Sequence, residues 1–241
     1  MGDRNAMRLD EAKRDHFRKL AHDEGYRSRA AFKLKQINEK YHLFGANSSV
    51  VDIGCAPGGW LEVLSESVGE RGRVVGVDMV AVKPLEKKNV TILRANITSR
   101  GFLDKLKTEL RKSKADCVVA DLSPKLSGIW DMDHFRQIDL CQMVIDILPE
   151  LLVEDGSCVM KAFHGGELEA LTQRLRASFS FVDISKPPAS RKESSEVYLV
   201  ARHFKGLVPE RQIVSRRKEP ESESPEDSSE YAMQDDLLPE A

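Results

Sequence analysis

A glycine-rich turn joins an apolar segment to a predicted helix near residue 54. The segment from Val50 to Trp60 reads Val-Val-Asp-Ile-Gly-Cys-Ala-Pro-Gly-Gly-Trp. Glycine lets the backbone approach a ligand closely and adopt turns that other residues disfavour. Such a turn can hold the nucleotide part of a cofactor, although a tight turn without a ligand gives the same pattern, and so does a dinucleotide-binding oxidoreductase.

The glycine spacing and two polar residues favour S-adenosylmethionine over NAD. Gly54, Gly58 and Gly59 depart from the G-x-G-x-x-G spacing that cradles a pyrophosphate. Asp78 follows the next predicted strand, where a carboxylate can accept hydrogen bonds from ribose hydroxyls. Asn96 follows the third strand, where its oxygen can accept from the adenine amine. Singly, Asp78 can be a turn acid and Asn96 a helix N-cap, but together with the loop they predict S-adenosylmethionine.

Four charged residues lie at or near the ends of predicted elements. Asp121 follows the apolar run 118–120, and Lys161 ends the next strand. Both lie at the carboxyl edge of the sheet, where ligands bind in open α/β folds. A charged residue at the end of an apolar strand is ordinarily a solvated terminus. Lys33 on a basic helix and Glu196 at the start of the last strand are two further candidates for the same site.

These residues fall in five motifs that closely resemble those of the FtsJ (RrmJ) family of ribose 2′-O-methyltransferases, in the same order. The motifs are Arg27–Leu34, Asp52–Trp60, Asp121–Pro124, Lys161–Phe163 and Ser195–Tyr198. The resemblance spans roughly residues 10–205, and five ordered motifs make it specific. It implies an S-adenosylmethionine-dependent enzyme that methylates a ribose 2′-hydroxyl of RNA.

The resemblance also implies a role for individual residues, and it implies no metal site. The implied reacting group is the tetrad Lys33, Asp121, Lys161 and Glu196. The implied cofactor contacts are Gly58, Trp60, Asp78, Asn96 and Asp121. The family commonly has Asp where this chain has Asn96, so the adenine contact there is expected to differ.

Lys161 can serve the implied reaction in two ways. Methyl transfer from a sulfonium needs an in-line oxygen nucleophile, and a ribose hydroxyl is a poor one until its proton is leaving. As a neutral amine Lys161 accepts that proton, whereas as a cation it orients the hydroxyl and the proton leaves later. Lys33 nearby favours the neutral amine, and the carboxylates of Asp121 and Glu196 favour the cation. The sequence leaves both alternatives open.

The expected substrate is a uridine of 23S rRNA, in the large ribosomal subunit or its precursor. The Gly58-Gly59-Trp60 form and the short chain resemble the large-subunit rRNA enzymes more than the tRNA-directed relatives. A tRNA ribose methyltransferase is one alternative. A non-catalytic RNA-binding assembly factor is another, which the intact tetrad opposes. An oxidoreductase is a third, which the glycine spacing opposes.

From residue 49 onward, β-branched runs alternate with longer helical patterns, which is typical of a doubly wound sheet. The predicted strands are Ser49–Ile53, Arg73–Val77, Val90–Leu93, Cys117–Ala120, Ser157–Met160, Phe181–Ile184 and Glu196–Ala201. Helices are predicted near 10–22, 28–40, 59–68, 100–112, 133–153 and 166–178. We expect a Rossmann-like class I methyltransferase fold, with a seven-stranded, mostly parallel sheet, one antiparallel edge strand and helices on both faces. Gly25 is the expected stop between the first two helices, and Ser28 the expected N-cap of the second.

The charge distribution divides the chain. Residues 219–241 hold nine Asp or Glu and no Lys or Arg, so residues 1–218 carry 37 basic against 30 acidic residues. We expect N-terminal basic helices over 1–44, packed on a methyltransferase domain over 45–205, and a disordered acidic tail over 206–241. Six basic residues are candidates for phosphate contacts, or else an ordinary solvated face: Lys13, Arg14, Arg18, Lys19, Arg27 and Arg29.

Cysteine usage and hydropathy bear on the compartment. Cys55, Cys117, Cys141 and Cys158 form no Cys-x-x-Cys pair, so we expect reduced core thiols rather than zinc ligands. The sequence shows neither a signal-peptide pattern nor an apolar run of membrane-spanning length. A cytoplasmic monomer is the expectation.

Overall fold

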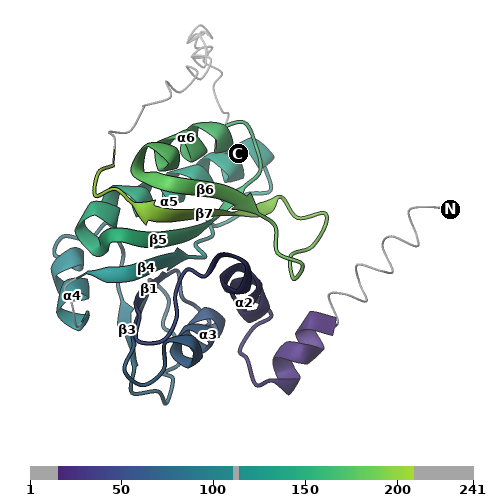
Figure 1. Cartoon of the computed structure of the whole chain (residues 1–241). Coiled ribbons are helices and arrows are strands. Elements are labelled where there is room, and N and C mark those ends of the chain that lie inside the picture. The colour runs from purple at the N-terminus through teal and green to yellow at the C-terminus, as the bar shows by residue number, and fades with distance from the viewer. Residues whose placement is uncertain (1–15, 111–113, 209–241) are drawn as a thin grey trace, which may run out of the picture. The chain divides into compact units, whose positions relative to one another are not determined.

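The computed structural model describes residues 16–110 and 114–208. They belong to one compact unit, Met1–Glu210, built on a seven-stranded sheet (Figure 1). The strands are β1 (Ser49–Ile53), β2 (Arg73–Asp78), β3 (Val90–Arg94), β4 (Ala115–Ala120), β5 (Leu152–Phe163), β6 (Phe179–Ser185) and β7 (Glu196–Phe204). All seven predicted strands are present; β1 has the predicted bounds and the others extend beyond theirs. Residues 209–241 of the predicted tail, the helix segment 10–15, Lys13 and Arg14 lie outside the described residues.

The order of the strands is β3-β2-β1-β4-β5-β7-β6. The chain runs from β1 to β2 and β3 on one side, and then continues from β4 on the other side. The point of reversal, between β1 and β4, is where ligands bind in such sheets. Ile53 lies opposite Ala120, and Ala120 lies opposite Met160. Because these strands are parallel, Gly54, Asp121 and Lys161 emerge at the same edge.

The last two strands form an antiparallel pair at one edge of the sheet. The strand that runs antiparallel to the others is not the outermost one, however, so the predicted antiparallel edge strand is wrong in its position. β7 pairs antiparallel with both β5 and β6 and lies between them, so the edge strand is β6. This order arises from the connection between β5 and β6 through α6 (Leu168–Ser178). It places β6 two positions from β5 in the sheet and leaves one position open between them. The connection 186–195 then reverses the direction of the chain, and β7 pairs between β5 and β6. The sheet is otherwise parallel, and the predicted fold class is confirmed.

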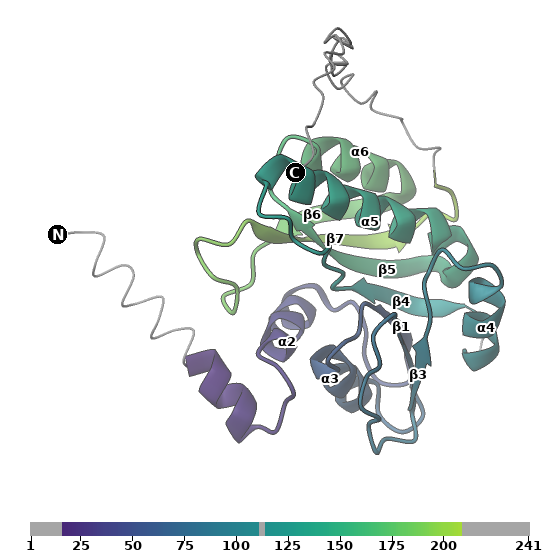
Figure 2. The ribbon, with the colours of Figure 1, turned by 180° about the vertical axis from the view of Figure 1, so that it is seen from behind.

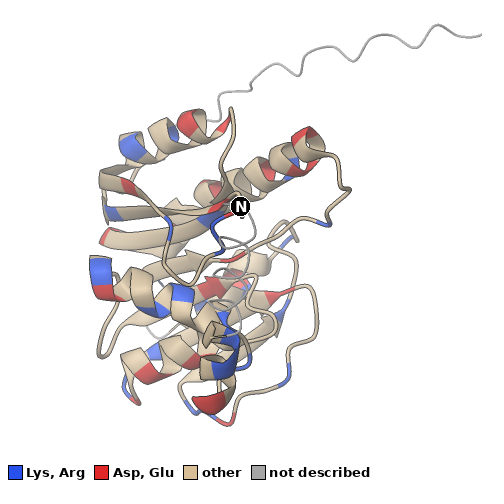
Figure 3. Ribbon diagram, turned by 90° about the vertical axis from the view of Figure 1, so that its right-hand side faces the viewer, with Lys and Arg blue, Asp and Glu red and all other residues tan. Residues whose placement is uncertain are grey.

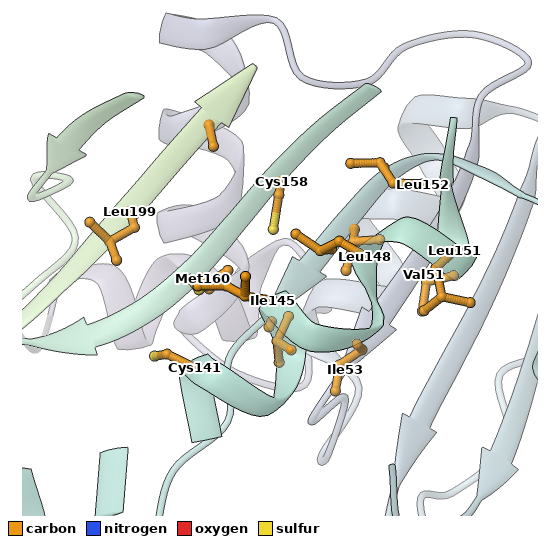
Figure 4. Packing of buried hydrophobic residues seen from close by; sticks show 14 of the residues in the cluster. Val51, Ile53, Cys141, Ile145, Leu148, Leu151, Leu152, Cys158, Met160 and Leu199 are labelled. Atoms are coloured by element: carbon orange, nitrogen blue, oxygen red, sulfur yellow. The ribbon is translucent and has the colours of Figure 1, made fainter. Parts of the chain in front are cut away.

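Helices cover both faces of the sheet (Figures 1 and 2). α2 (Ala30–Tyr41) and α3 (Gly59–Val68) lie on one face. α4 (Phe102–Glu109), α5 (Trp130–Leu151) and α6 lie on the other. Alternate strand residues point to opposite faces, so Val51 and Ile53 pack with Ile145 and Leu148 of α5, as Figure 4 shows. Val50 packs toward α2 and α3, and Asp52, two residues on, shares its face.

The N-terminal helices pack against the body of the protein. Residues 16–23 are helical, and Gly25 ends this helix with φ +78°, as predicted. Phe32 of α2 forms a small apolar cluster with Phe17, Ala21 and Ala189. This cluster ties the first helix to the connection between β6 and β7.

The predicted N-cap of α2 is wrong. The N-cap residue is Arg29, and no side chain caps the helix. The Ala31 N–H donates to the backbone carbonyl of Ser28 and not to its side chain. The Ser28 hydroxyl is therefore not a cap, and it is buried without a hydrogen-bond partner among the described residues.

All four cysteines are buried and unpaired, as expected of reduced core thiols. Within the described ranges no group of three or more His, Cys, Asp or Glu side chains is placed to hold a metal ion. Among the same residues, none of the helices is long and apolar enough to cross a membrane.

Candidate active site

Lys161 and Asp121 meet at the carboxyl edge of the sheet. The Lys161 Nζ atom lies 3.1 Å from Asp121 Oδ1 and donates a hydrogen bond of 3.2 Å to the Asp121 carbonyl. The Lys161 side chain is only 5% exposed and the Asp121 side chain 21%. A buried ammonium is costly unless it is paired. The neighbouring carboxylate therefore holds the Lys161 side chain in place.

Ser123 completes the contacts of Lys161 and was not singled out from the sequence. Its hydroxyl accepts a 2.7 Å hydrogen bond from Lys161 Nζ, and Ser123 itself is exposed. The amine at this position therefore binds an alcohol oxygen at the surface of the site. Because Ser123 lies two residues after Asp121, the same turn supplies both the carboxylate and the alcohol.

Lys33 and Glu196 form a second ion pair. Lys33 Nζ donates to Glu196 Oε2 over 2.8 Å, and the two side chains are 8% and 27% exposed. Burial acts to raise the pKa of Glu196, but the charge and hydrogen bond of Lys33, helped by Lys161 and Arg29, hold this pKa below its ordinary value. The pair fastens α2 to the start of β7.

Tyr198 links the two ion pairs and was also not singled out from the sequence. It lies directly opposite Lys161 in the β5–β7 register. Its hydroxyl donates to Asp121 Oδ1 over 3.2 Å, and the Lys33 ammonium lies 5.6 Å from the centre of its ring. Burial, followed by the charges of Asp121 and Glu196, raises the pKa of Tyr198. Tyr198 is therefore a neutral donor, and the predicted tetrad is a connected network.

The glycine-rich loop packs closely against the chain that follows β4. Gly54 has φ +81°, and a Cβ atom there would lie 2.8 Å from the Leu122 side chain and 3.1 Å from its backbone. Gly58 has φ +114° and precedes the first turn of α3. The Trp60 indole is buried and donates to the Ala30 carbonyl over 2.8 Å. Because the indole is buried and already bonded, the group of Trp60 available to a ligand is its backbone N–H, in the first turn of α3.

Asp78 is the last residue of β2, one residue earlier in relation to the strand than predicted, and Asn96 follows β3 as predicted. The Asp78 carboxylate accepts from the Ala56 N–H (2.9 Å) and the Val80 N–H (2.8 Å). These bonds orient it beside the glycine loop and leave further lone pairs for hydroxyl donors. The Asn96 oxygen accepts from the Thr98 N–H (3.0 Å) and hydroxyl (2.9 Å). That oxygen is therefore already occupied, and the side-chain amide nitrogen is the group of Asn96 suited to a ligand.

Asp52 is a buried acid beneath the glycine loop whose importance the sequence did not reveal. It is fully buried, and neither carboxylate oxygen has a hydrogen-bond partner among the described residues. Burial, with smaller contributions from the charges of Asp121 and Asp78, raises its pKa well above the ordinary value. Three carboxyl groups thus converge at one edge, an arrangement that suits a positively charged ligand. S-adenosylmethionine, which carries a sulfonium and an ammonium, fits this set.

Arg27 clamps the cofactor loops together, contrary to its predicted role in phosphate binding. Its guanidinium pairs with Glu62 (Nε–Oε1, 3.2 Å) and donates to the carbonyls of Pro57 (3.3 Å), Lys83 and Pro84 (2.8 Å). Its own backbone N–H donates to the other Glu62 oxygen over 2.8 Å. These acceptors occupy the guanidinium donors, so Arg27 joins the glycine loop to the β2–β3 connection instead of reaching outward.

The reversal in strand order, the glycine-rich loop and the acidic edge are together those of an α/β methyltransferase. The FtsJ-like methyltransferase family model matches residues 26–204. The chain therefore belongs to the FtsJ-like methyltransferase family. The predicted family and the predicted cofactor, S-adenosylmethionine, are confirmed.

Relatives of similar length carry one name. The "ribosomal RNA large subunit methyltransferase E" of Methanocaldococcus jannaschii is 41% identical over 229 residues, covering 94% of each chain. That of Methanothermobacter thermautotrophicus is 44% identical over 196 residues, covering 81% of this chain and 92% of its own. A crystal structure of a Plasmodium falciparum ribosomal RNA methyltransferase superposes with a TM-score of 0.66 at 28% identity, covering 74% of this chain and 98% of its own.

The buried acid gives a prediction about stability and pH. Because the folded-state pKa of Asp52 is raised, its contribution to stability is full below its unfolded pKa and is lost as pH rises toward the folded pKa. Relative to Asp52→Asn, the free energy of unfolding of the wild type should fall by up to about 1.4 kcal/mol per pH unit above pH 4. Urea unfolding of both proteins from pH 4.5 upward measures this. Asp104→Asn, which changes an exposed acid on α4, is the control; a difference between wild type and Asp52→Asn that is constant with pH would contradict the assignment.

The clamp gives a prediction about cofactor affinity. Lysine cannot reach Glu62 and three carbonyls at once, so Arg27→Lys should weaken S-adenosylmethionine binding about tenfold, the scale of one charge-assisted hydrogen bond. Calorimetric titration measures the affinity. Arg18→Lys, on the exposed face of helix 16–23, should leave it unchanged. Equal affinities for Arg27→Lys and the wild type would show that the clamp does not shape the cofactor site.

Proposed function

We propose that this protein transfers a methyl group from S-adenosylmethionine to a ribose 2′-hydroxyl of RNA, with a uridine of 23S rRNA as the target. The carrying observation is the contact of Lys161 with an alcohol oxygen, 2.7 Å away, beside the Asp121 carboxylate. Relatives at 41–44% identity that are named large-subunit rRNA methyltransferases support the substrate class. The protein is proposed to act as a monomer in the cytoplasm, on the large subunit or its precursor.

The cofactor is proposed to lie across the glycine loop. When bound, S-adenosylmethionine supplies a methyl group on a positively charged sulfur. Asp78 accepts from its ribose hydroxyls, and the Asn96 amide nitrogen donates to the adenine. Met79 and Val80 are 64% and 62% exposed directly after Asp78, and they offer the adenine an apolar surface. The backbone of Gly58 and Trp60 and the carboxylate of Asp121 hold the methionine part.

The tetrad is proposed to hold and then deprotonate the target hydroxyl. Three oxygen atoms surround the Lys161 Nζ atom as hydrogen-bond acceptors, so of the two roles for this lysine we propose the orienting one. Lys161 donates to the 2′-oxygen in place of Ser123 and fixes it in line with the methyl group. The oxygen becomes strongly acidic as its bond to the methyl carbon forms and the bond from that carbon to sulfur breaks, which leaves a neutral thioether. Its proton then passes to the Asp121 carboxylate and on to solvent.

Lys33 and Glu196 are proposed as positioning residues that keep α2 against the site. Arg29, Lys35 and the basic β6–β7 connection, with Lys186, Arg191 and Lys192, lie in the segments joined around Phe32. They are proposed to contact RNA phosphates, as are Arg18 and Lys19 on the preceding helix. Figure 3 shows basic and acidic residues interspersed over this side of the ribbon, so phosphate binding is proposed for this group of segments and not for a whole basic face.

Replacing Lys161 tests the function. Lys161→Ala should lower the rate of methyl transfer by about 10²–10⁴-fold while S-adenosylmethionine still binds. Labelled methyl transfer to unmethylated large-subunit RNA, small-subunit RNA and tRNA measures both rate and substrate class. Lys107→Ala, at an ion pair on α4 away from this edge, should stay active. Transfer to tRNA alone, or near-normal activity of Lys161→Ala, would contradict the proposal.

A further inference from the structure

A group of large apolar side chains is exposed beside the active site. They belong to the connection from β4 to α5 and to the first turns of α5, and this connection begins at Asp121. Soluble proteins rarely expose such groups without a binding role. Their exposed fractions range from 41% to 65%: Leu126, Ile129, Trp130, Met132 and Phe135.

Trp130 is the aromatic centre of this group and borders the tetrad. Its ring stacks on Phe163 (centroids 6.0 Å apart, planes at 27°) and on His134 (5.8 Å, 21°). Phe163 and His134 are buried, whereas Trp130 is 48% exposed. Phe163 follows Lys161 by two residues on β5 and lies opposite Glu196 in the sheet. The half-exposed indole therefore packs on two buried rings, one of which lies two residues from Lys161 on β5.

The segment that carries Trp130 is held firmly in place. The buried Asp133 carboxylate accepts from the Ser127 N–H (2.7 Å), the Ser127 hydroxyl (2.7 Å) and the Gly128 N–H (3.1 Å). Arg136 donates to the Lys125 carbonyl over 3.2 Å. The apolar side chains are thus presented by an ordered turn, and a partner that binds them need not order the turn first.

We propose that Trp130 is a stacking platform for an unpaired RNA base next to the methylated nucleotide. This inference rests on the proposed function, which places a ribose at Lys161 and hence its neighbouring bases within reach of Phe163 and Trp130. A flat indole that is 48% exposed can stack on the flat surface of any base. Lys125, exposed beside it, supplies positive charge for an adjoining phosphate. These features favour RNA over a protein partner.

The platform would act on RNA binding and not on the chemical step. Stacking by an aromatic residue contributes the equivalent of about 5- to 150-fold in affinity per base. Trp130→Ala should therefore raise the KM for RNA within that range and leave kcat within about twofold. Trp130→Phe keeps a stacking ring and should recover most of the loss. Ile184→Ala, at an exposed apolar residue on the edge strand β6, should match the wild type.

A substrate and a spectroscopic readout complete the test. An RNA with an abasic site beside the target should raise the KM of the wild type, with little further effect on Trp130→Ala. RNA should also quench the tryptophan fluorescence of the wild type much more than that of Trp130→Phe, in which only the buried Trp60 remains.

Two outcomes separate this inference from the proposed function. If the wild type transfers no methyl to RNA, the proposed function fails. If it does transfer methyl but Trp130→Ala keeps the wild-type KM, the stacking inference is overturned. Sedimentation that shows Trp130→Ala changing self-association, with the KM for RNA unchanged, would assign the surface to contact between protein chains and would equally overturn it.

Discussion

Two buried lysines each need a carboxylate as an ion-pair partner, and most of the site depends on this constraint. Lys161 and Lys33 are 5% and 8% exposed at their side chains and pair with Asp121 and Glu196. Removing one member would leave the other charge buried and uncompensated. The pairs join α2, β4, β5 and β7, and Tyr198 connects them through its hydroxyl and its ring. The requirement to pair these charges thus positions the N-terminal helix over the reacting edge of the sheet.

Beside these balanced ion pairs, the edge of the sheet at the glycine-rich loop carries an excess of acidic groups. Asp52 has no hydrogen-bond partner in the described part of the chain, and Asp78 and Asp121 raise its pKa further. Asp121 is paired with Lys161, but Asp52 and Asp78 have no ion pair among the described residues. This excess of acidic groups favours a cationic ligand, and its binding would relieve their repulsion. The Arg27 guanidinium pairs with Glu62 and donates hydrogen bonds to backbone carbonyls. It therefore stabilises the loops around the acids without neutralising the acids themselves.

The strand pattern predicted the sheet and the common edge of Asp121 and Lys161, because parallel strands end together. It could not fix the place of β7, since a short hairpin can turn to either side of β6. Lys33 and Glu196 lie 163 residues apart, so only the family resemblance brought them together. The phosphate contact predicted for Arg27 did not anticipate its hydrogen bonds to backbone carbonyls, because every residue has a carbonyl and the sequence does not show which ones lie near Arg27. Asp52 was missed because its face in an apolar strand shows only once the sheet is built.

The central claim is that the methyl group goes to a ribose oxygen held by Lys161. The most direct measurement is the location of the label after large-subunit RNA is methylated, digested to nucleosides and separated into base and sugar by mass spectrometry. The account predicts all of the label on the sugar, and none when the target carries a 2′-deoxyribose. Label on a base, or undiminished transfer to the 2′-deoxy substrate, would contradict it.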